Sequence, residues 1–185
     1  LQISGFGGET NHTNITHVFF KGTPKVKSSA ADCFRNCDRL KYFQYPDTIT
    51  ELEAYCFQLT KSLEAFRLNK GLKIIGDSAL NQAFEESSDP YELYIPGTVS
   101  QLDQYGVSYL FSNITSITIG GPGDGTNLRT LSPNALSQNQ KASWMTVYST
   151  GPLESSFKTL LEATSTDPQA GFIKPNVTIN YVNAW

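Results

Sequence analysis

Charge is scarce in this chain, and it is not concentrated anywhere along the sequence. Of the 185 residues 17% are charged, with 14 basic and 17 acidic side chains, and the densest basic stretch, "KGTPKVK", holds only three lysines. A nucleic-acid-binding protein needs a basic stripe to displace the counterions of the phosphate backbone, so we expect no nucleic-acid partner. No apolar run is long enough to cross a bilayer, so we also expect no membrane insertion of this segment.

Residues that carry catalytic or metal chemistry are equally few. The two histidines, His12 and His17, lie in a polar N-terminal segment, and nothing in the sequence positions a partner for either of them as a catalytic base. Cys33 and Cys37 have too few partners for zinc, which prefers four ligands. The stretch "GGPGDGTN" lacks the Lys-Ser/Thr of a phosphate-binding loop and the alternating aspartates of a calcium loop. We therefore expect a protein that is not an enzyme, with no catalytic residue, metal or cofactor.

What the chain does contain is an internal repeat. Apolar–x–apolar pairs recur with their first members 23 to 28 residues apart. The pairs are Phe20/Gly22 (with a degenerate second position), Phe43/Tyr45, Phe66/Leu68, Leu93/Ile95, Ile117/Ile119 and Met145/Val147. Each pair predicts a short strand with alternate side chains directed inward. A period of this length is typical of a solenoid, in which one unit buries its apolar side only against its neighbours.

The residues that follow each pair keep the same phase. The recurring positions are Val26, Ile49, Leu72 and Val99, then Ser29, Leu52, Ile75 and Leu102, then the small–apolar pairs Cys33-Phe34, Cys56-Phe57, Ala79-Leu80 and Gly106-Val107. Extra residues fall in "AFEESSDP" and in "GGPGDGTN", where loops of a solenoid are expected. The Gly-rich insertion is predicted to be a surface loop, with a possible role as a contact site.

These repeats resemble the BspA-type leucine-rich repeat family of bacterial surface proteins. The matching stretches are "CDRLKYFQYPDTITELEAYCFQLTKSL", "YELYIPGTVSQLDQYGV", "IIGDSAL" and "AADCFRNCDRL". The resemblance implies an α/β leucine-rich repeat solenoid, a right-handed stack of about five or six degenerate repeats with a parallel β ribbon and a helix-containing C-terminal cap. It also implies a non-catalytic recognition module, at the cell surface or secreted, that acts in adhesion or host interaction. The alternative that we consider is a structural or docking domain of a virion tail or surface assembly.

The two ends of the chain depart from the repeat. We divide the chain into an N-terminal segment (1–17), the solenoid (18–150) and a C-terminal cap (151–185). The N-terminal segment is either a loop or the remnant of an upstream unit. In the cap, Leu153, Phe157, Leu160 and Leu161 would share one face of a helix. A final strand is expected to direct Val177, Ile179 and Tyr181 to one side.

Strand positions that alternate with the core positions should face outward. One such column reads Phe19, Tyr42, Ala65, Glu92, Ser116 and Trp144, and the next reads Lys21, Gln44, Arg67, Tyr94, Thr118 and Thr146. Aromatic residues and arginine are enriched at protein interfaces, although strands also favour aromatics and threonine for packing alone. The candidate ligand-binding residues are Phe19, Lys21, Tyr42, Gln44, Arg67, Glu92, Tyr94, Thr118 and Trp144, for a protein or alternatively a glycan partner.

Cysteines and sequons leave two chemical questions open. Cys33 and Cys56 hold equivalent positions in adjacent repeats, and stacked strands about 4.7–4.9 Å apart would permit a disulfide, although two buried thiols are favoured. With Cys37 the number of cysteines is odd, which does not make a disulfide framework. Four sequons occur, at Asn11, Asn14, Asn113 and Asn176, which is little more than composition alone would produce.

Overall fold

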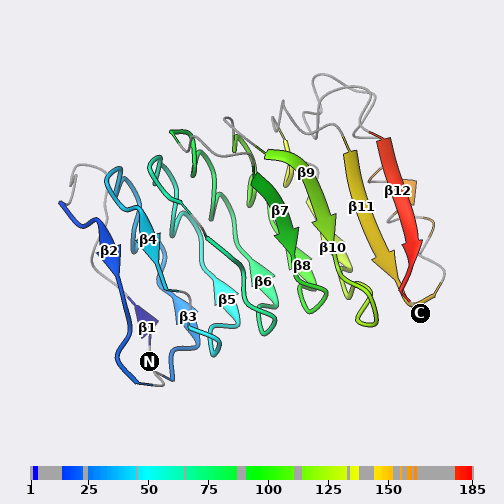
Figure 1. Cartoon of the computed structure of the whole chain (residues 1–185), viewed down its shortest axis with the longest axis horizontal. Coiled ribbons are helices and arrows are strands. Elements are labelled where there is room, and N and C mark those ends of the chain that lie inside the picture. The colour runs from blue at the N-terminus through cyan, green and yellow to red at the C-terminus, as the bar shows by residue number, and fades with distance from the viewer. Residues whose placement is uncertain are drawn as a thin grey trace.

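The repeats stack into two rows of parallel strands (Figure 1). The computed structural model describes residues 2–3, 14–22, 25–44, 46–64, 66–86, 91–110, 114–132, 134–137, 144–151, 155, 158–159, 161 and 178–184. The lower row is one six-stranded sheet of β1 (Gln2–Ile3), β3 (Ser28–Ser29), β5 (Glu51–Leu52), β6 (Ile74–Ile75), β8 (Gln101–Leu102) and β10 (Thr130–Leu131). The upper row contains the pair β2 (His17–Val18) and β4 (Tyr42–Phe43), then the four-stranded sheet of β7 (Tyr91–Ile95), β9 (Ile114–Ile119), β11 (Trp144–Ser149) and β12 (Thr178–Asn183).

The lower row stacks one buried residue from each repeat. The paired residues Ser29, Leu52, Ile75, Leu102 and Leu131 follow one another in register and are all buried. The sequence predicted this phase but placed strands only at the apolar–x–apolar pairs, so the lower row is a second parallel sheet that it did not predict. Ser29 fits among the aliphatic residues because its hydroxyl accepts a hydrogen bond from the Glu53 N–H at 3.2 Å.

The upper row follows the predicted register in its C-terminal part. Leu93, Ile117 and Met145 pair in sequence across β7, β9 and β11, and all three are buried. In the first repeat the register differs from the prediction, because Val18, and not Phe20, pairs with Phe43. Phe20 instead meets the Phe43 ring edge-on, with ring centroids 5.8 Å apart.

Turns form a third column of contacts between repeats. The N–H of Phe34 donates to the Cys56 carbonyl at 2.8 Å, and the N–H of Phe57 donates to the Ala79 carbonyl at 2.8 Å. Non-glycine residues with positive φ recur at two equivalent positions of these turns: Asp32, Tyr55, Ser78 and Tyr105 at the first, and Asn36, Leu59, Gln82 and Tyr109 at the second. Left-handed backbone costs an L-residue roughly 1–2 kcal/mol, so stacking of the turns must hold it in place.

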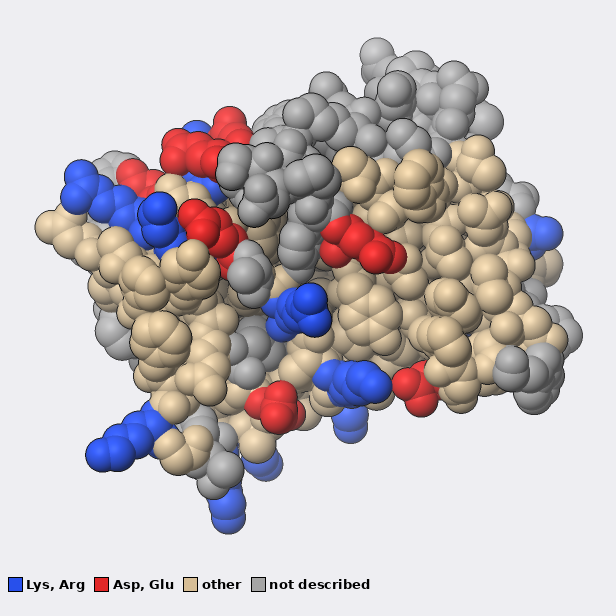
Figure 2. Space-filling model, viewed as in Figure 1, with Lys and Arg blue, Asp and Glu red and all other residues tan. Residues whose placement is uncertain are grey.

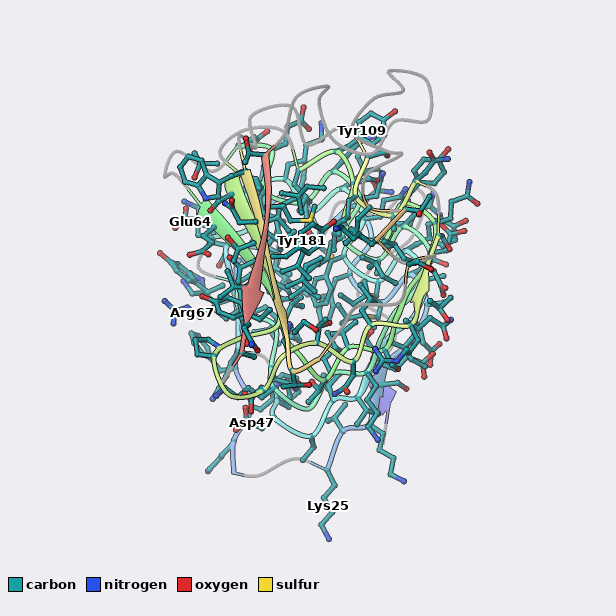
Figure 3. The ribbon with its side chains drawn as sticks, turned by 90° about the vertical axis from the view of Figure 1, so that its right-hand side faces the viewer. Lys25, Asp47, Glu64, Arg67, Tyr109 and Tyr181 are labelled. Atoms are coloured by element: carbon teal, nitrogen blue, oxygen red, sulfur yellow. The ribbon has the colours of Figure 1, made fainter. Side chains whose placement is uncertain are left out.

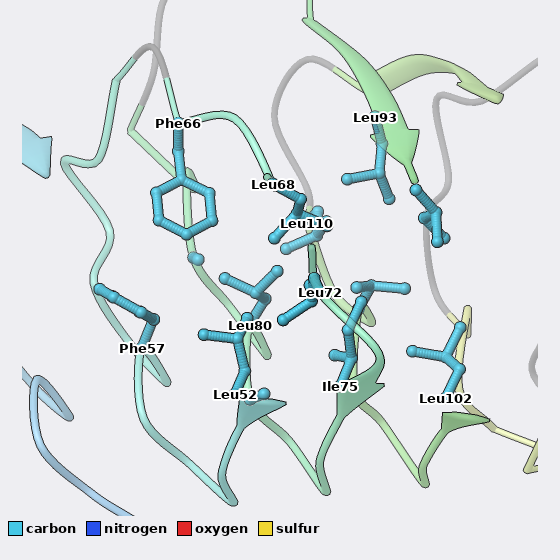
Figure 4. Packing of buried hydrophobic residues seen from close by; sticks show 14 of the residues in the cluster. Leu52, Phe57, Phe66, Leu68, Leu72, Ile75, Leu80, Leu93, Leu102 and Leu110 are labelled. Atoms are coloured by element: carbon cyan, nitrogen blue, oxygen red, sulfur yellow. The ribbon is translucent and has the colours of Figure 1, made fainter. Parts of the chain in front are cut away.

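The core between the rows changes character along the stack. In the N-terminal repeats, phenylalanine rings touch across units: Phe34 stacks on Phe57 at 5.2 Å between centroids, and Phe57 lies 5.1 Å from Phe66. Figure 4 shows Phe57 and Phe66 followed along the stack by Leu72, Leu80 and Ile75. Among the described residues from Leu93 onward, the buried hydrophobic side chains are aliphatic, apart from Met145.

Both ends of the chain carry strands that extend the stack. The backbone of β1 pairs with β3, as an upstream rung would, while residues 4–13 lie outside the described residues. At the other end β12 confirms the predicted final strand and pairs with β11 along its whole length. The helix-containing cap is not confirmed, because almost no helix is present among the described residues. Leu161 is buried against the core, whereas Leu153, Phe157, Leu160 and Val177 lie outside the described part.

Candidate functional site

The outward columns of the upper row are in register from β7 to β12. Glu92 pairs with Ser116 and Ser116 with Trp144, while Tyr94 pairs with Thr118 and Thr118 with Thr146. β12 adds Thr178 beside Trp144 and Asn180 beside Thr146. The geometry therefore places the predicted columns side by side on one sheet surface, with Ala65 outside the described residues.

At the N-terminal end of this surface the first column starts with His17, and not with Phe19 as the sequence predicted. His17 pairs with Tyr42, and their ring centroids lie 4.8 Å apart. Phe19 therefore falls level with Gln44, and its side chain is 70% exposed. Lys21 is exposed and lies beyond the residues that pair with β4. The sequence pattern predicted Phe20 opposite Phe43, whereas Val18 occupies that position, and this shifts Phe19 and Lys21 away from their predicted columns.

Tyr42 belongs to a small polar cluster on the exposed surface. Its hydroxyl donates to a Glu64 carboxylate oxygen at 2.9 Å, and this hydrogen bond raises the pKa of Tyr42. Lys41 forms an ion pair with the other Glu64 oxygen at 3.5 Å. Arg67 lies on the same side of the molecule as Glu64, as Figure 3 shows, and is exposed.

In the middle of the surface, Tyr94 packs against the Gly-rich insertion. Its hydroxyl lies close to Gly121, where an added Cβ would meet it at 3.2 Å, and its side chain is half-buried. Burial raises the pKa of Tyr94, and the Asp124 carboxylate raises it further. Glu92, which is exposed, accepts a hydrogen bond from the Thr118 hydroxyl at 2.5 Å. The sequence placed Tyr94 outward but had no signal that the insertion would cover part of it.

The insertion is a compact loop that also contacts the backbone just after β12. Gly125 donates its N–H to the Gly121 carbonyl at 2.9 Å, and Gly123 donates to Ala184 at 2.6 Å. A side chain at Gly97 or Gly120 would collide with the Gly125 carbonyl oxygen. This close approach explains why glycine is needed at these two positions, and it fixes the loop beside the strand surface.

Trp144 is the largest exposed side chain among the described residues of the C-terminal part, with 50% of its surface accessible. Beside it, Ser116 faces outward but is only 6% exposed. Figure 2 shows that the surface over β9 and β11 carries few charged groups, whereas Asp, Glu, Lys and Arg side chains gather over the N-terminal repeats. Trp144 thus stands on a broad uncharged area.

Other predicted candidates do not form a chemical centre. Cys33, Cys37 and Cys56 are buried thiols that are not joined in disulfides. The Cys33 thiol donates to the Cys56 carbonyl at 3.8 Å and the Cys56 thiol to the Ala79 carbonyl at 3.7 Å, while burial raises the pKa of Cys56 to about 12. Thiols with raised pKa are poor nucleophiles. Within the described ranges, no group of three metal-ligating side chains occurs.

Of the four sequons, the structure describes the one at Asn14. Asn14 is exposed, and its side-chain oxygen accepts a hydrogen bond from Arg39 at 2.9 Å. Asn11, Asn113 and Asn176 lie outside the described residues, as does His12. In the described part of the chain, no helix has the length and apolar character required to span a membrane.

Comparisons with known proteins agree with the repeat. The model of the family described as "BspA type Leucine rich repeat region" matches residues 10–143 in six copies. A leucine-rich repeat protein from Bacteroides ovatus ATCC 8483, solved by crystallography, is similar in fold with a TM-score of 0.57 and 21% sequence identity. That similarity covers 72% of this chain and 31% of the other, so the chain spans about a third of the Bacteroides protein. No match was found among curated proteins.

Proposed function

We propose that this chain, which belongs to the BspA-type leucine-rich repeat family, is a non-catalytic recognition module that binds a protein partner through the outward surface of the upper row. Family membership supports a protein-interaction module built of repeats. Adhesion or host contact, by a protein that is secreted or held at the cell surface, is the role that we propose for it. A glycan is the alternative ligand on the same surface.

The observation that carries the proposal is the exposure of large aromatic side chains along the upper row, on β4, on β11 and just beyond β2. Trp144 is 50% exposed, Tyr42 39% and Phe19 70%. Exposed apolar area of this kind is costly to leave in water, and aromatic residues dominate the free energy of many protein interfaces. Gln44, Arg67, Glu92 and Thr118 would supply the polar rim around these anchors.

Binding to arrays of extracellular-matrix proteins and glycans tests the proposal. Wild-type protein is expected to bind at least one component, and the Tyr42→Ala/Tyr94→Ala/Trp144→Ala variant is expected to lose that binding. Because Tyr94 packs against the insertion, the Tyr42→Ala/Trp144→Ala variant serves as a second version that removes only exposed rings. Tyr55→Ala/Tyr105→Ala, which removes two rings from the turns, is the matched control.

Two outcomes would contradict the proposal. Wild-type protein that binds no component at high micromolar concentration would argue against a recognition module. A triple variant that stays folded and binds fully would place the contact elsewhere. The parent gene distinguishes the surface module from the alternative function, a docking domain of a virion tail or surface assembly. A secretion signal or lipid-anchor cysteine upstream supports the surface module, and a position among structural virion genes supports the alternative.

A further inference from the structure

A second outward column, on the lower row, carries a basic residue at every other repeat. The residues that precede the lower strands are Lys27, Thr50, Lys73, Ser100 and Arg129, which we call the basic column. Backbone hydrogen bonds join each residue to the next. The N–H groups of Thr50, Lys73, Ser100 and Arg129 donate to the backbone carbonyls of Lys27, Thr50, Lys73 and Ser100, respectively, at 2.8 to 3.0 Å. Strands in a sheet lie about 4.8 Å apart, so the cations are spaced by roughly 10 Å along a line.

The cations of this column are exposed, and none of them forms an ion pair with an acidic residue in the described part of the chain. The ion pairs of the described residues include those of Arg35, Lys41 and Lys61, which lie outside this column. Lys27, Lys73 and Arg129 form none with a described carboxylate, and the Arg129 guanidinium donates only to the Leu128 carbonyl at 3.1 Å.

The residues between the cations supply hydrogen-bonding groups. The Thr50 hydroxyl donates to the Lys27 carbonyl at 3.1 Å and the Ser100 hydroxyl to the Lys73 carbonyl at 3.3 Å. Each hydroxyl oxygen still has lone pairs that can accept hydrogen bonds from a ligand. The column therefore alternates a cation with a hydroxyl acceptor over five repeats.

We propose that the basic column binds a linear anionic polysaccharide that carries one carboxylate in each disaccharide. Such a polymer alternates a charge with neutral hydroxyl groups, which matches the alternation of the column. A nucleic-acid strand carries a phosphate about every 3.4 Å, far denser than the cations here. Single-stranded nucleic acids also bind proteins through aromatic stacking platforms, and this column contains no aromatic residue.

Titration with hyaluronate oligosaccharides tests the proposal. The wild-type chain is expected to bind an oligosaccharide with three carboxylates more tightly than one with two, and neutral dextran not at all. The Lys27→Gln/Lys73→Gln/Arg129→Gln variant is expected to bind about tenfold more weakly, because each exposed ion pair contributes modestly. Added salt should weaken the binding of the wild-type chain, since exposed charges are screened.

The matched control variant removes three positive charges from residues outside the basic column. Arg39→Gln/Lys61→Gln/Lys158→Gln is expected to bind hyaluronate as wild type does, and so is Tyr42→Ala/Trp144→Ala, which keeps this test separate from the upper-row proposal. Circular dichroism confirms folding of each variant. The proposal is overturned by absence of hyaluronate binding, by equal losses in both charge variants, or by tighter binding of oligothymidylate or polyglutamate with the same number of charges.

Discussion

The N-terminal and C-terminal repeats solve the same packing problem in different ways. In the N-terminal repeats the upper strands are two residues long, and Phe66–Leu68 forms no strand although both residues are buried. Phenylalanine rings and stacked turns connect the units there. In the C-terminal repeats the upper strands span five or six residues over a mainly aliphatic core. In the upper row, cohesion between repeats thus shifts from aromatic side chains to backbone ladders along one solenoid, while the stacked turns continue through both halves.

This difference predicts which substitutions destabilise each half. A ring stack concentrates contacts in a few large side chains, so loss of one ring is felt in several units. A long ladder distributes the contacts over many backbone groups, so a single side chain matters less. In a solenoid each repeat contacts only its neighbours, which lets the two halves be tested separately.

The largest effect is expected from Phe57→Ala, in the middle of the ring stack. Phe57 contacts Phe34, Phe43 and Phe66 at 4.9 to 5.2 Å between centroids. Removal of a buried phenylalanine side chain costs about 3–5 kcal/mol, whereas Ile117→Val in the aliphatic half costs about 0.5–1.5 kcal/mol. Urea denaturation measures both. A loss for Phe57→Ala no larger than that for Ile117→Val would mean that the rings do not hold the N-terminal repeats together.

A smaller loss is expected from Gly120→Ala in the C-terminal half. Gly120 has φ of +77°, and an added Cβ would meet the Gly125 carbonyl oxygen. Left-handed backbone and overpacking together cost about 2–4 kcal/mol. Gly123→Ala is the control, since φ is +79° there but the space is open. Thermal unfolding that is equally affected in both variants would show that the insertion does not pack as described.

Asn69→Ala should destabilise the N-terminal half by about 1–3 kcal/mol, because it leaves buried polar groups without partners. The Asn69 side chain donates to the carbonyls of Pro46 and Ile49 at 2.8 and 3.0 Å and accepts from the Gly71 N–H at 2.9 Å. Hydrogen exchange would locate the loss near these residues. Exchange that increases first in β9 and β11 would contradict a local effect.

The smallest effect is a pH dependence that comes from a buried thiol of the N-terminal half. Burial raises the pKa of Cys56 to about 12 from an ordinary value of 9.0. Because the folded pKa is the higher one, the contribution to stability is complete below pH 9 and is lost as the pH rises toward 12. At one unit above the ordinary value the loss is on the order of 1 kcal/mol.

Urea midpoints measured below and above pH 9 test this dependence. The wild-type midpoint should fall more steeply with pH than that of Cys56→Ala, while other groups titrate equally in both. The same pH dependence of the midpoint in both proteins would show that burial does not raise the pKa of the Cys56 thiol. In the native protein a thiol reagent at neutral pH should also react with Cys56 only after unfolding.

Much of the fold could be predicted from the sequence because successive repeats carry the same pattern of buried positions. The phase of Leu93, Ile117 and Met145 specifies which residues are buried, since stacked units must place equivalent side chains over one another. The outward columns from Glu92 to Trp144 follow from the same alternation. Where the repeat is degenerate, as at Phe20 and Gly22, the phase was lost and with it the correct positions of Phe19 and Lys21. The cap helix was expected from a short amphipathic pattern, and such a pattern does not determine structure by itself.

The repeat pattern is enough to specify the solenoid, with its period and its inward residues. Which dispersed residues become neighbours follows only from how the repeats pack. Lys27, Lys73 and Arg129 lie far apart in a chain with no basic cluster, and stacking sets them in one line. Tyr94, on β7, meets Gly121 because the Gly-rich insertion that follows β9 packs beside the neighbouring strand. Local patterns encode burial, whereas surface chemistry depends on distances between units, which are set by how the units pack.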